Sequence, residues 1–307
     1  MRPRSILLLV ALAVGLTVLV VVQWRRHASP GSHEPIVLPP AAVVTSAAAT
    51  AAVADASSTG AVAATVVDLA PLNELRTLIR EDKLGEARQK AMDLLSATSN
   101  SAAAAQIEEL LGGVHVKLVM APYAMPEKVD YVVAKGDSVA KIAQKYGTTV
   151  DLVMKANNLA KPNLIKVGDR YRVFTGKFSI TVNKTRNELL LQMNGAFFKR
   201  YRVGTGKFGR TPAGAYVISE RIVDPPWWRS DGRQIPYGDK ENILGTRWMA
   251  LKATGTTADA RGYGIHGTWD ESTIGKSESA GCVRLKNQDV EELFALVPVG
   301  TTVAIEE

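Results

Sequence analysis

Apolar and polar residues follow different periods along the chain, and each period predicts a different kind of structure. Residues 5–22 form one uncharged apolar run, which as a helix would be about 27 Å long and would match a bilayer core. Residues 70–113 carry leucine and alanine at helical spacing, which predicts two or three short helices. After Gly176 apolar residues recur at every second position, which predicts an antiparallel β domain with a type I′ hairpin at Asn194-Gly195.

The first apolar run is flanked by arginines on both sides, at positions 2 and 4 and at positions 25 and 26. It is either a signal anchor retained over residues 1–27 or a signal peptide that is cleaved. It is longer than a usual signal-peptide core and no clear Ala-x-Ala site follows, which favours a retained single-pass transmembrane helix. Residues 28–69 consist mainly of Ala, Val, Pro, Ser and Thr, so they are predicted to form a flexible linker.

The helical pattern of residues 70–113 contains Gly85-Glu86-Ala87-Arg88, which resembles part of a tetratricopeptide unit. One such unit cannot bury its face alone, so a helical spacer that packs on its neighbours is the favoured interpretation. Residues 114–128 contain Pro122 and Pro126 and are predicted to be an extended connector.

Residues 129–174 have the pattern of a small βααβ module. The predicted elements are a strand at 131–133, a helix capped by Asp137 or Ser138 and ended by Gly147, a second helix from Thr149, and a strand at 171–173.

The β domain is interrupted by a long segment, residues 225–242, that is rich in aromatic and turn residues. Two interpretations stay open: Trp227 and Trp228 either cover a functional site or simply pack on the sheet. A helix is expected from Asn287, and a final strand is expected near Val303.

Cys282 is the only cysteine in the chain, so it cannot form an internal disulfide. It is therefore either a reactive thiol or an incidental one. The preceding Ser279, Ala280 and Gly281 form a turn of small residues whose backbone N–H groups are suited to binding an oxyanion. His266 is a candidate base for the thiol proton, so this stretch favours acyl transfer.

The residues around Cys282 match a longer pattern. They are His266-Gly267-Thr268, Ile274-Gly275 and Ser279-Ala280-Gly281-Cys282-Val283-Arg284, with further blocks at 204–206, 211–214, 242–248 and 300–303. In this order they resemble the L,D-transpeptidase catalytic domain (YkuD/ErfK type) over about residues 177–307. Ala280 departs from the family pattern, which normally has a histidine there.

The resemblance implies a mainly antiparallel β-sandwich and a cysteine-dependent acyltransferase that acts on peptidoglycan. Cys282 would be the nucleophile, His266 would move the proton, and the backbone carbonyl of Gly267 would orient the imidazole. Gly281 and Ser279 would form the oxyanion and substrate region. Arg284 is either a contact for a substrate carboxylate or a structural charge. The implied donor is a tetrapeptide stem that loses its terminal D-Ala, and an amine of a second stem would complete a 3-3 cross-link.

The small module also matches a known pattern, through residues 131–138, 142–143, 156–158 and 163–168. These residues resemble a LysM domain, which implies binding to glycan strands that contain N-acetylglucosamine. The candidate glycan contacts lie in two loops: Gly136, Asp137 and Ser138 in the first, Asn163 and Ile165 in the second.

Composition narrows the possible partners. The chain has 307 residues, 46% of them hydrophobic, which suits a globular protein of two or three small domains. Its net charge of +7 favours anionic surfaces as partners. It has no dense Lys/Arg run, so no nucleic-acid partner is expected. No phosphate-binding glycine loop occurs, and His27, His33 and His115 lie outside any motif, so no cofactor and no metal are expected.

The sequence therefore predicts a multi-domain membrane protein. Its β domain would face the periplasm or cell envelope, where peptidoglycan stem peptides and glycan strands are found. The leading function is an L,D-transpeptidase. Two alternatives stay open: an L,D-carboxypeptidase, in which water resolves the thioester, and a non-catalytic wall-binding protein, which the departure at Ala280 keeps in consideration.

Overall fold

The computed structural model describes residues 70–259 and 261–307, so the predicted anchor (1–27) and linker (28–69) lie outside the described residues. Among the helices within these ranges, none combines the length and the hydropathy that a membrane span requires.

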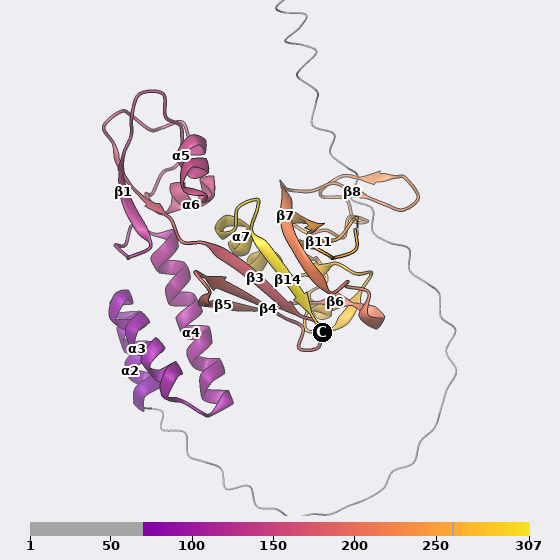
Figure 1. The fold of residues 1–307 in the computed structure, drawn as a ribbon, viewed down its shortest axis with the longest axis horizontal. Coiled ribbons are helices and arrows are strands. Elements are labelled where there is room, and N and C mark those ends of the chain that lie inside the picture. The colour runs from indigo at the N-terminus through magenta and orange to yellow at the C-terminus, as the bar shows by residue number, and fades with distance from the viewer. Residues whose placement is uncertain (1–69, 260) are drawn as a thin grey trace, which may run out of the picture. The chain divides into compact units, whose positions relative to one another are not determined.

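Three helices open the described chain: α2 (Ala70–Arg80), α3 (Leu84–Ala97) and α4 (Ser101–Met120) (Figure 1). Asn100 caps α4, because its side-chain oxygen accepts hydrogen bonds from the N–H groups of Ala102 and Ala103 at 3.0 and 3.1 Å. The helices bury their leucines against one another, and α4 also packs on β5 (Ala196–Arg202). This is the packing that the helical-spacer interpretation requires.

The prediction of an extended connector from residue 114 is wrong, because α4 continues to Met120. Buried apolar residues continue at helical spacing through Val114 and Leu118. Gly112 marks a close approach instead of a helix end: a Cβ there would lie 2.9 Å from Cγ of Lys199 on β5. The glycine therefore lets the helix backbone approach the sheet.

The small module contains β1 (Lys128–Val132), α5 (Val139–Tyr146), α6 (Val150–Lys155) and β2 (Arg170–Phe174), and its two strands pair antiparallel. The side chain of Ser138 accepts from the Lys141 N–H at 3.2 Å to cap α5. Gly147 ends α5 with a φ of 63°, and Thr149 caps α6. The predicted βααβ order is confirmed.

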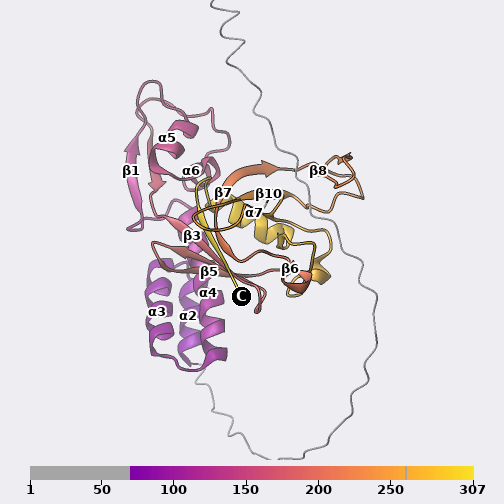
Figure 2. The same ribbon diagram turned by 45° about the vertical axis from the view of Figure 1, so that its right-hand side comes forward.

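The β domain is built on one curled, eight-stranded sheet in the order β13-β11-β10-β7-β14-β3-β4-β5 (Figure 2). Two neighbouring pairs, β14–β3 and β11–β13, are parallel, and the other pairs are antiparallel. Besides β5, the strands are β3 (Phe178–Asn183), β4 (Glu188–Met193), β7 (Gly214–Val223), β10 (Arg247–Ala253), β11 (Gly264–His266), β13 (Val283–Arg284) and β14 (Thr302–Glu306). The mainly antiparallel, sandwich-like architecture agrees with the predicted fold class.

Shorter elements surround this sheet. The small sheets are β6 (Thr205–Gly206) with β12 (Ser277–Ser279) and β8 (Trp227–Trp228) with β9 (Gln234–Ile235); the helices are α7 (Asn287–Leu296), η1 (Lys207–Gly209) and η2 (Glu271–Thr273). The helix predicted from Asn287 and the strand predicted near Val303 are confirmed. So is the β4–β5 turn, where Asn194 and Gly195 have φ values of 51° and 81°.

The core of the β domain also receives side chains from the two preceding regions. Val119 of α4 and Leu152 of α6 belong to this core and have no exposed surface. The Thr149 hydroxyl accepts from the Leu152 N–H at 2.9 Å and donates to the Ala295 carbonyl on α7. The small module is therefore packed against the β domain through α6.

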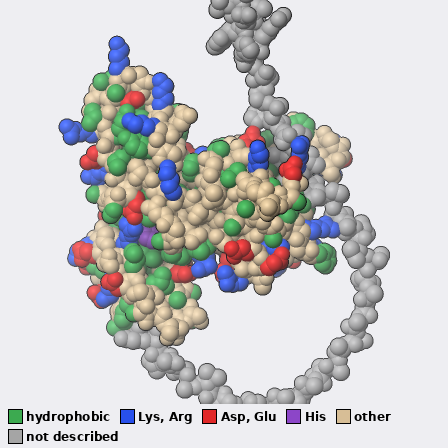
Figure 3. All heavy atoms as spheres, in the orientation of Figure 1, with side chains coloured by type: hydrophobic (Ala, Val, Ile, Leu, Met, Phe, Trp, Pro, Cys, Tyr) green, Lys and Arg blue, Asp and Glu red, His purple; other side chains and the backbone are tan. Residues whose placement is uncertain are grey.

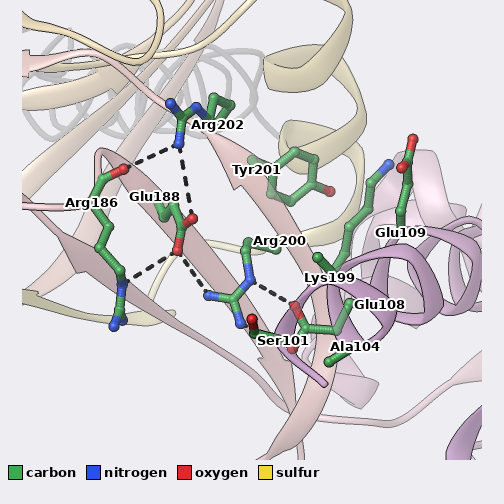
Figure 4. A pocket seen from close by; sticks show the side chains of 11 residues that line it. Ser101, Ala104, Glu108, Glu109, Arg186, Glu188, Lys199, Arg200, Tyr201 and Arg202 are labelled. Atoms are coloured by element: carbon green, nitrogen blue, oxygen red, sulfur yellow. Dashed lines mark hydrogen bonds and ion pairs between the residues drawn. The ribbon is translucent and has the colours of Figure 1, made fainter. Parts of the chain in front are cut away.

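A network of paired charges lies where α4 meets β4 and β5, around a cavity of about 520 Å³ (Figure 4). Arg200 donates two hydrogen bonds to Glu108 at 2.8 and 3.0 Å and a third to Glu188 at 3.2 Å. Arg186 and Arg202 also lie within 3.4 and 4.0 Å of Glu188. We call these five residues the seam network; its ion pairs join α4 to the sheet.

Candidate active site

Cys282 follows a tight turn that connects β12 to β13. The Ser279 hydroxyl accepts from the Gly281 N–H at 3.0 Å and donates to the Cys282 carbonyl at 2.7 Å. Gly281 has a φ of 147°, and a Cβ there would lie 2.5 Å from the Tyr263 ring, so only glycine fits. The polar groups of Ser279 and the N–H of Gly281, both predicted to face the substrate, are instead used to form the turn.

The Cys282 side chain is almost completely buried, with 2% of the residue exposed. Its Sγ lies 3.6 Å from the carbonyl oxygen of Gly262. Burial raises the pKa of the Cys282 thiol to about 12, although the Gly264 N–H and the charge of Arg284 act in the opposite direction. In this state the side chain is a neutral thiol, and it needs a base to become a nucleophile.

His266 ends β11, the strand that pairs with β13 in parallel register, so that His266 lies opposite Arg284. The imidazole Nδ1 is 2.6 Å from the carbonyl oxygen of Gly267, which can only accept, so Nδ1 carries the proton in this contact; the Leu244 backbone also interacts with the ring. Burial lowers the pKa of His266 to about 4. Gly267 cannot be replaced without movement, because a Cβ would lie 2.2 Å from Oδ1 of Asn287.

Trp248 lies near both Cys282 and His266. Its ring stacks on His266 with centroids 5.6 Å apart, and it belongs to the same apolar cluster as Cys282 and Leu244. Sequence reasoning placed Trp248 in a family block but gave it no role. The alternation of side chains along a strand was the available signal. Met249 faces the main core, so its neighbour Trp248 faces the other side of the sheet.

The aromatic segment of residues 225–242 contributes to this cluster. Trp227 and Trp228 are half-buried and pack against it, which agrees with the packing interpretation of this segment. Asn242, which is 1% exposed, closes the base of the segment: its Nδ2 donates to the carbonyls of Pro225, Ile235 and Pro236 at 3.0 to 3.2 Å.

Arg284 lies opposite His266, and part of its guanidinium group has no hydrogen-bond partner in the described part of the chain. Its Nε and Nη2 are buried and have no hydrogen-bond partner among the described residues. Burial lowers the pKa of Arg284, while Asp270 and Glu278 oppose that effect from a distance. A buried guanidinium without acceptors is costly unless another molecule supplies them.

Comparison with known proteins identifies the family. Residues 177–305 match the family described as "L,D-transpeptidase catalytic domain". The putative L,D-transpeptidase YqjB of Bacillus subtilis is 40% identical over 127 residues, which are 41% of this chain and 69% of that protein. Putative L,D-transpeptidase YkuD of the same organism is 30% identical over 181 residues, which are 57% of this chain and 97% of that protein. The chain belongs to the L,D-transpeptidase family.

Residues 131–173 of this L,D-transpeptidase match the family described as "LysM domain". Solved L,D-transpeptidase structures are more distant. One from Mycobacterium tuberculosis H37Rv is 15% identical with a TM-score of 0.35, over 46% of this chain and 64% of that one. One from Mycobacterium smegmatis is 18% identical with a TM-score of 0.34, over 46% and 65%. These values are too low to place individual residues.

The LysM residues predicted to contact glycan are partly used within the module. The Asp137 carboxylate accepts from the Tyr131 hydroxyl and the Ala134 N–H, both at 2.7 Å, and Ser138 caps α5. Ile165 packs against the module core, whereas Asn163 is exposed and Gly136 turns the first loop with a φ of 88°.

Ala280 is half-buried in the turn before Cys282. His266 lies against Trp248 and beside the Gly267 carbonyl, so the candidate base does not come from position 280. Within the described residues, no cluster of three or more His, Cys, Asp or Glu side chains is arranged to hold a metal ion.

Proposed function

We propose that this L,D-transpeptidase forms 3-3 peptidoglycan cross-links by acyl transfer through Cys282. One observation carries the proposal: Cys282 directly precedes β13, the neighbour of the His266 strand, and it shares an apolar cluster with Trp248, on which the His266 ring stacks. The carbonyl of Gly267 orients that ring. This arrangement gives a thiol and an oriented base in a largely dry site.

In the first step, Sγ of Cys282 attacks the carbonyl carbon between the third stem residue and the terminal D-Ala. The thiol proton passes to Nε2 of His266 as the S–C bond forms. Because the pKa of the thiol is raised and that of the imidazole is lowered, a separated thiolate and imidazolium are unfavourable in this buried site. Proton transfer is therefore coupled to attack.

The tetrahedral intermediate then collapses. The C–N bond breaks, the departing D-Ala amine takes the proton from His266, and a thioester remains on Cys282. An amine of a second stem attacks the thioester and gives up a proton to His266, which returns it to the sulfur. The thiol of Cys282 and the neutral imidazole of His266 are thereby restored, and the cross-linked product is released.

Two groups are available to stabilise the charges of substrate and intermediate. The Cys282 N–H has no backbone acceptor among the described residues, which makes it a candidate oxyanion donor. The unpaired nitrogens of Arg284 suit a carboxylate of the stem peptide. The Gly281 N–H is already bonded to Ser279, so we assign Gly281 and Ser279 to shaping the turn.

Membership of the L,D-transpeptidase family favours the transpeptidase over the L,D-carboxypeptidase. We expect intact-mass measurement after exposure to a carbapenem, a β-lactam class that acylates this family, to show one adduct on Cys282. Incubation with disaccharide-tetrapeptide should then give more dimer than hydrolysed tripeptide; predominant hydrolysis would favour the carboxypeptidase, and no adduct would favour the wall-binding protein.

We further propose that the LysM module holds the protein on glycan strands. Its exposed surface is rich in basic side chains, which suits an anionic wall (Figure 3); they include Lys135, Lys141, Lys145, Lys161 and Lys166. Because Leu152 is part of the β-domain core, removing the module would also damage that domain, so point substitution is the better test. Asn163→Ala should reduce pelleting with purified sacculi and leave carbapenem acylation unchanged. Equal pelleting would remove Asn163 as a glycan contact.

We also propose that residues 1–27 remain attached as a single-pass anchor, with the catalytic domain in the periplasm or cell envelope. The length of the apolar run and the location of peptidoglycan support this assignment. N-terminal sequencing of membrane-extracted protein tests it, since a start near Ala28 would show that the segment is cleaved.

A further inference from the structure

The loop after β6 presents an exposed aromatic ring on a strained turn. The turn runs from Lys207 to Arg210 and is closed by the Arg210 N–H, which donates to the Lys207 carbonyl at 3.1 Å. Phe208 has a φ of 54° and Gly209 a φ of 70°, so both central residues have left-handed conformations. A bulky residue is disfavoured there, and the Phe208 side chain, which is 83% exposed, gains no packing in return.

The same chain contains a matched turn without this conflict. In the β4–β5 hairpin the corresponding positions are Asn194 and Gly195, the pair that this turn geometry prefers. That hairpin lies at the opposite edge of the sheet from β13. The turn geometry therefore does not require phenylalanine at position 208.

The strained turn lies next to the nucleophile. Gly204, just before β6, exchanges two backbone hydrogen bonds of 2.8 Å with Arg284 of β13. A Cβ on Gly206 would lie 2.9 Å from Cα of Gly281, and a Cβ on Gly281 would lie 3.2 Å from the Arg210 carbonyl oxygen. Strand β13 is thus flanked by the His266 strand on one side and by the segment leading to this turn on the other.

The position of β13 between these two segments suggests separate places for the amines and for the acyl chain of the substrate. The leaving amine and the incoming amine both exchange protons with His266, so both belong on the His266 side of Cys282. The acyl chain that stays on the sulfur extends in the other direction, toward residues 207–210. Lys207 is exposed and Arg210 is half-buried, and neither forms an ion pair with another described residue, so their charges remain available to an anionic chain.

We propose that residues 207–210 bind the retained stem peptide of the acyl donor. The Phe208 ring packs on the stem, and Lys207 and Arg210 face its carboxylates. This inference rests on the proposed function, because the position of the donor is deduced from the side of Cys282 on which His266 exchanges protons with the amines. It explains why a strained and exposed phenylalanine stands beside the nucleophile.

The decisive variant is Phe208→Asn in the full-length enzyme, because it installs the residue that the turn prefers and should not unfold the protein. We expect its Tm to rise by about 2–4 °C. The kcat/KM for disaccharide-tetrapeptide should fall at least about tenfold, and the rate of acylation by a carbapenem, which has no stem, should stay within about twofold.

The matched control is Asn194→Phe, which creates the same conflict far from Cys282. It also removes the Asn194 Oδ1 that accepts from the Lys177 N–H at 2.9 Å, so the Tm should fall while turnover of the tetrapeptide is unchanged. Lys207→Gln should lower kcat/KM for a stem with free carboxylates by more than for a stem whose carboxylates are amidated.

Three results would overturn the inference. Unchanged stem turnover in Phe208→Asn would make the residue a tolerated surface aromatic. A parallel loss of carbapenem acylation would mean that the turn supports the nucleophile, and a change confined to the KM of the acceptor would place the wrong substrate at the turn. A wild-type enzyme that is not acylated by a carbapenem would instead overturn the proposed function, before any variant is compared.

Discussion

Arg200 of the seam network and Arg284 of the active site are both partly buried arginines, but their partners differ completely. Arg200 has carboxylates on Nε, Nη1 and Nη2, and its pKa is raised, mainly by the hydrogen bond to Glu108. Arg284 keeps two buried nitrogens without partners among the described residues, and burial lowers its pKa. Paired charge joins elements of the fold, whereas the two unpartnered nitrogens of Arg284 are the observation behind its proposed role in ligand binding.

The largest expected effect comes from removing the nucleophile. Cys282→Ala should abolish both the carbapenem adduct and tetrapeptide turnover, because no other cysteine is present. Alanine fits a turn that Ser279 and Gly281 already hold, so the Tm should stay close to that of the wild type. Intact mass and product analysis measure the first two quantities. Continued tetrapeptide cleavage would show that Cys282 is not the nucleophile. The comparison between Arg284 and Arg200 would then lose its basis.

Removing the base should have the next largest effect. His266→Ala should slow single-turnover acylation at least about 100-fold, within the usual range for a general base. Ala280→His should change the same rate by less than about tenfold, because the described base already has its tautomer set by Gly267. A large gain from Ala280→His would show that the natural site is catalytically impaired and would favour the wall-binding alternative.

Two arginine substitutions test the comparison directly. Arg284→Gln should reduce kcat/KM for the tetrapeptide by about tenfold or more, with little loss of stability, because the buried charge it removes has no partner to leave behind. Arg200→Gln should leave acylation unchanged and reduce the free energy of unfolding by about 1–2 kcal/mol, because Glu108 loses a half-exposed charged partner. Denaturant unfolding and steady-state kinetics on both variants would show whether the two effects separate; an exchange of the two outcomes would contradict the assignment.

The smallest effect concerns pH. His266 has a pKa near 6.5 in the unfolded chain and about 4 in the folded protein, so between these values the unfolded state binds more protons. Stability should therefore fall as pH decreases through this window, by at most about 1.4 kcal/mol per pH unit from this group. His266→Gln should show a shallower decrease in chemical unfolding experiments between pH 6.5 and 4. Parallel curves for both proteins would mean that His266 is more hydrated than the structure indicates.

Local signals predicted the elements of the small module and the position of His266 well. Caps such as Ser138 and Thr149 act on their own helices, and period-two apolar patterns need only one neighbouring layer, so a single sequence displays both. The end of α4 was missed because Gly112 and Gly113 lower helix propensity. The apolar residues that continue at helical spacing, Val114 and Leu118, pack against the neighbouring helices and outweigh that cost.

The active site divides in the same way. Cys282, His266 and Gly267 lie in short motifs, so the sequence alone was enough to name them as candidates. The hydrogen bond from the Gly281 N–H to Ser279 and the stacking of Trp248 on His266 depend on backbone torsion and strand register. These features are properties of the assembled sheet, so residue types alone assigned Gly281 and Ser279 to the substrate and gave Trp248 no role.

The burial of Leu152 in the β-domain core has a consequence for how such proteins are assembled in evolution. Gene fusion usually exchanges modules at linkers where few contacts cross. Here the second LysM helix fills part of the neighbouring core and its cap bonds to α7, so a different LysM module would leave a hole and an unpaired carbonyl. A LysM module could therefore replace this one only if it supplied an apolar side chain and a hydroxyl at these two positions.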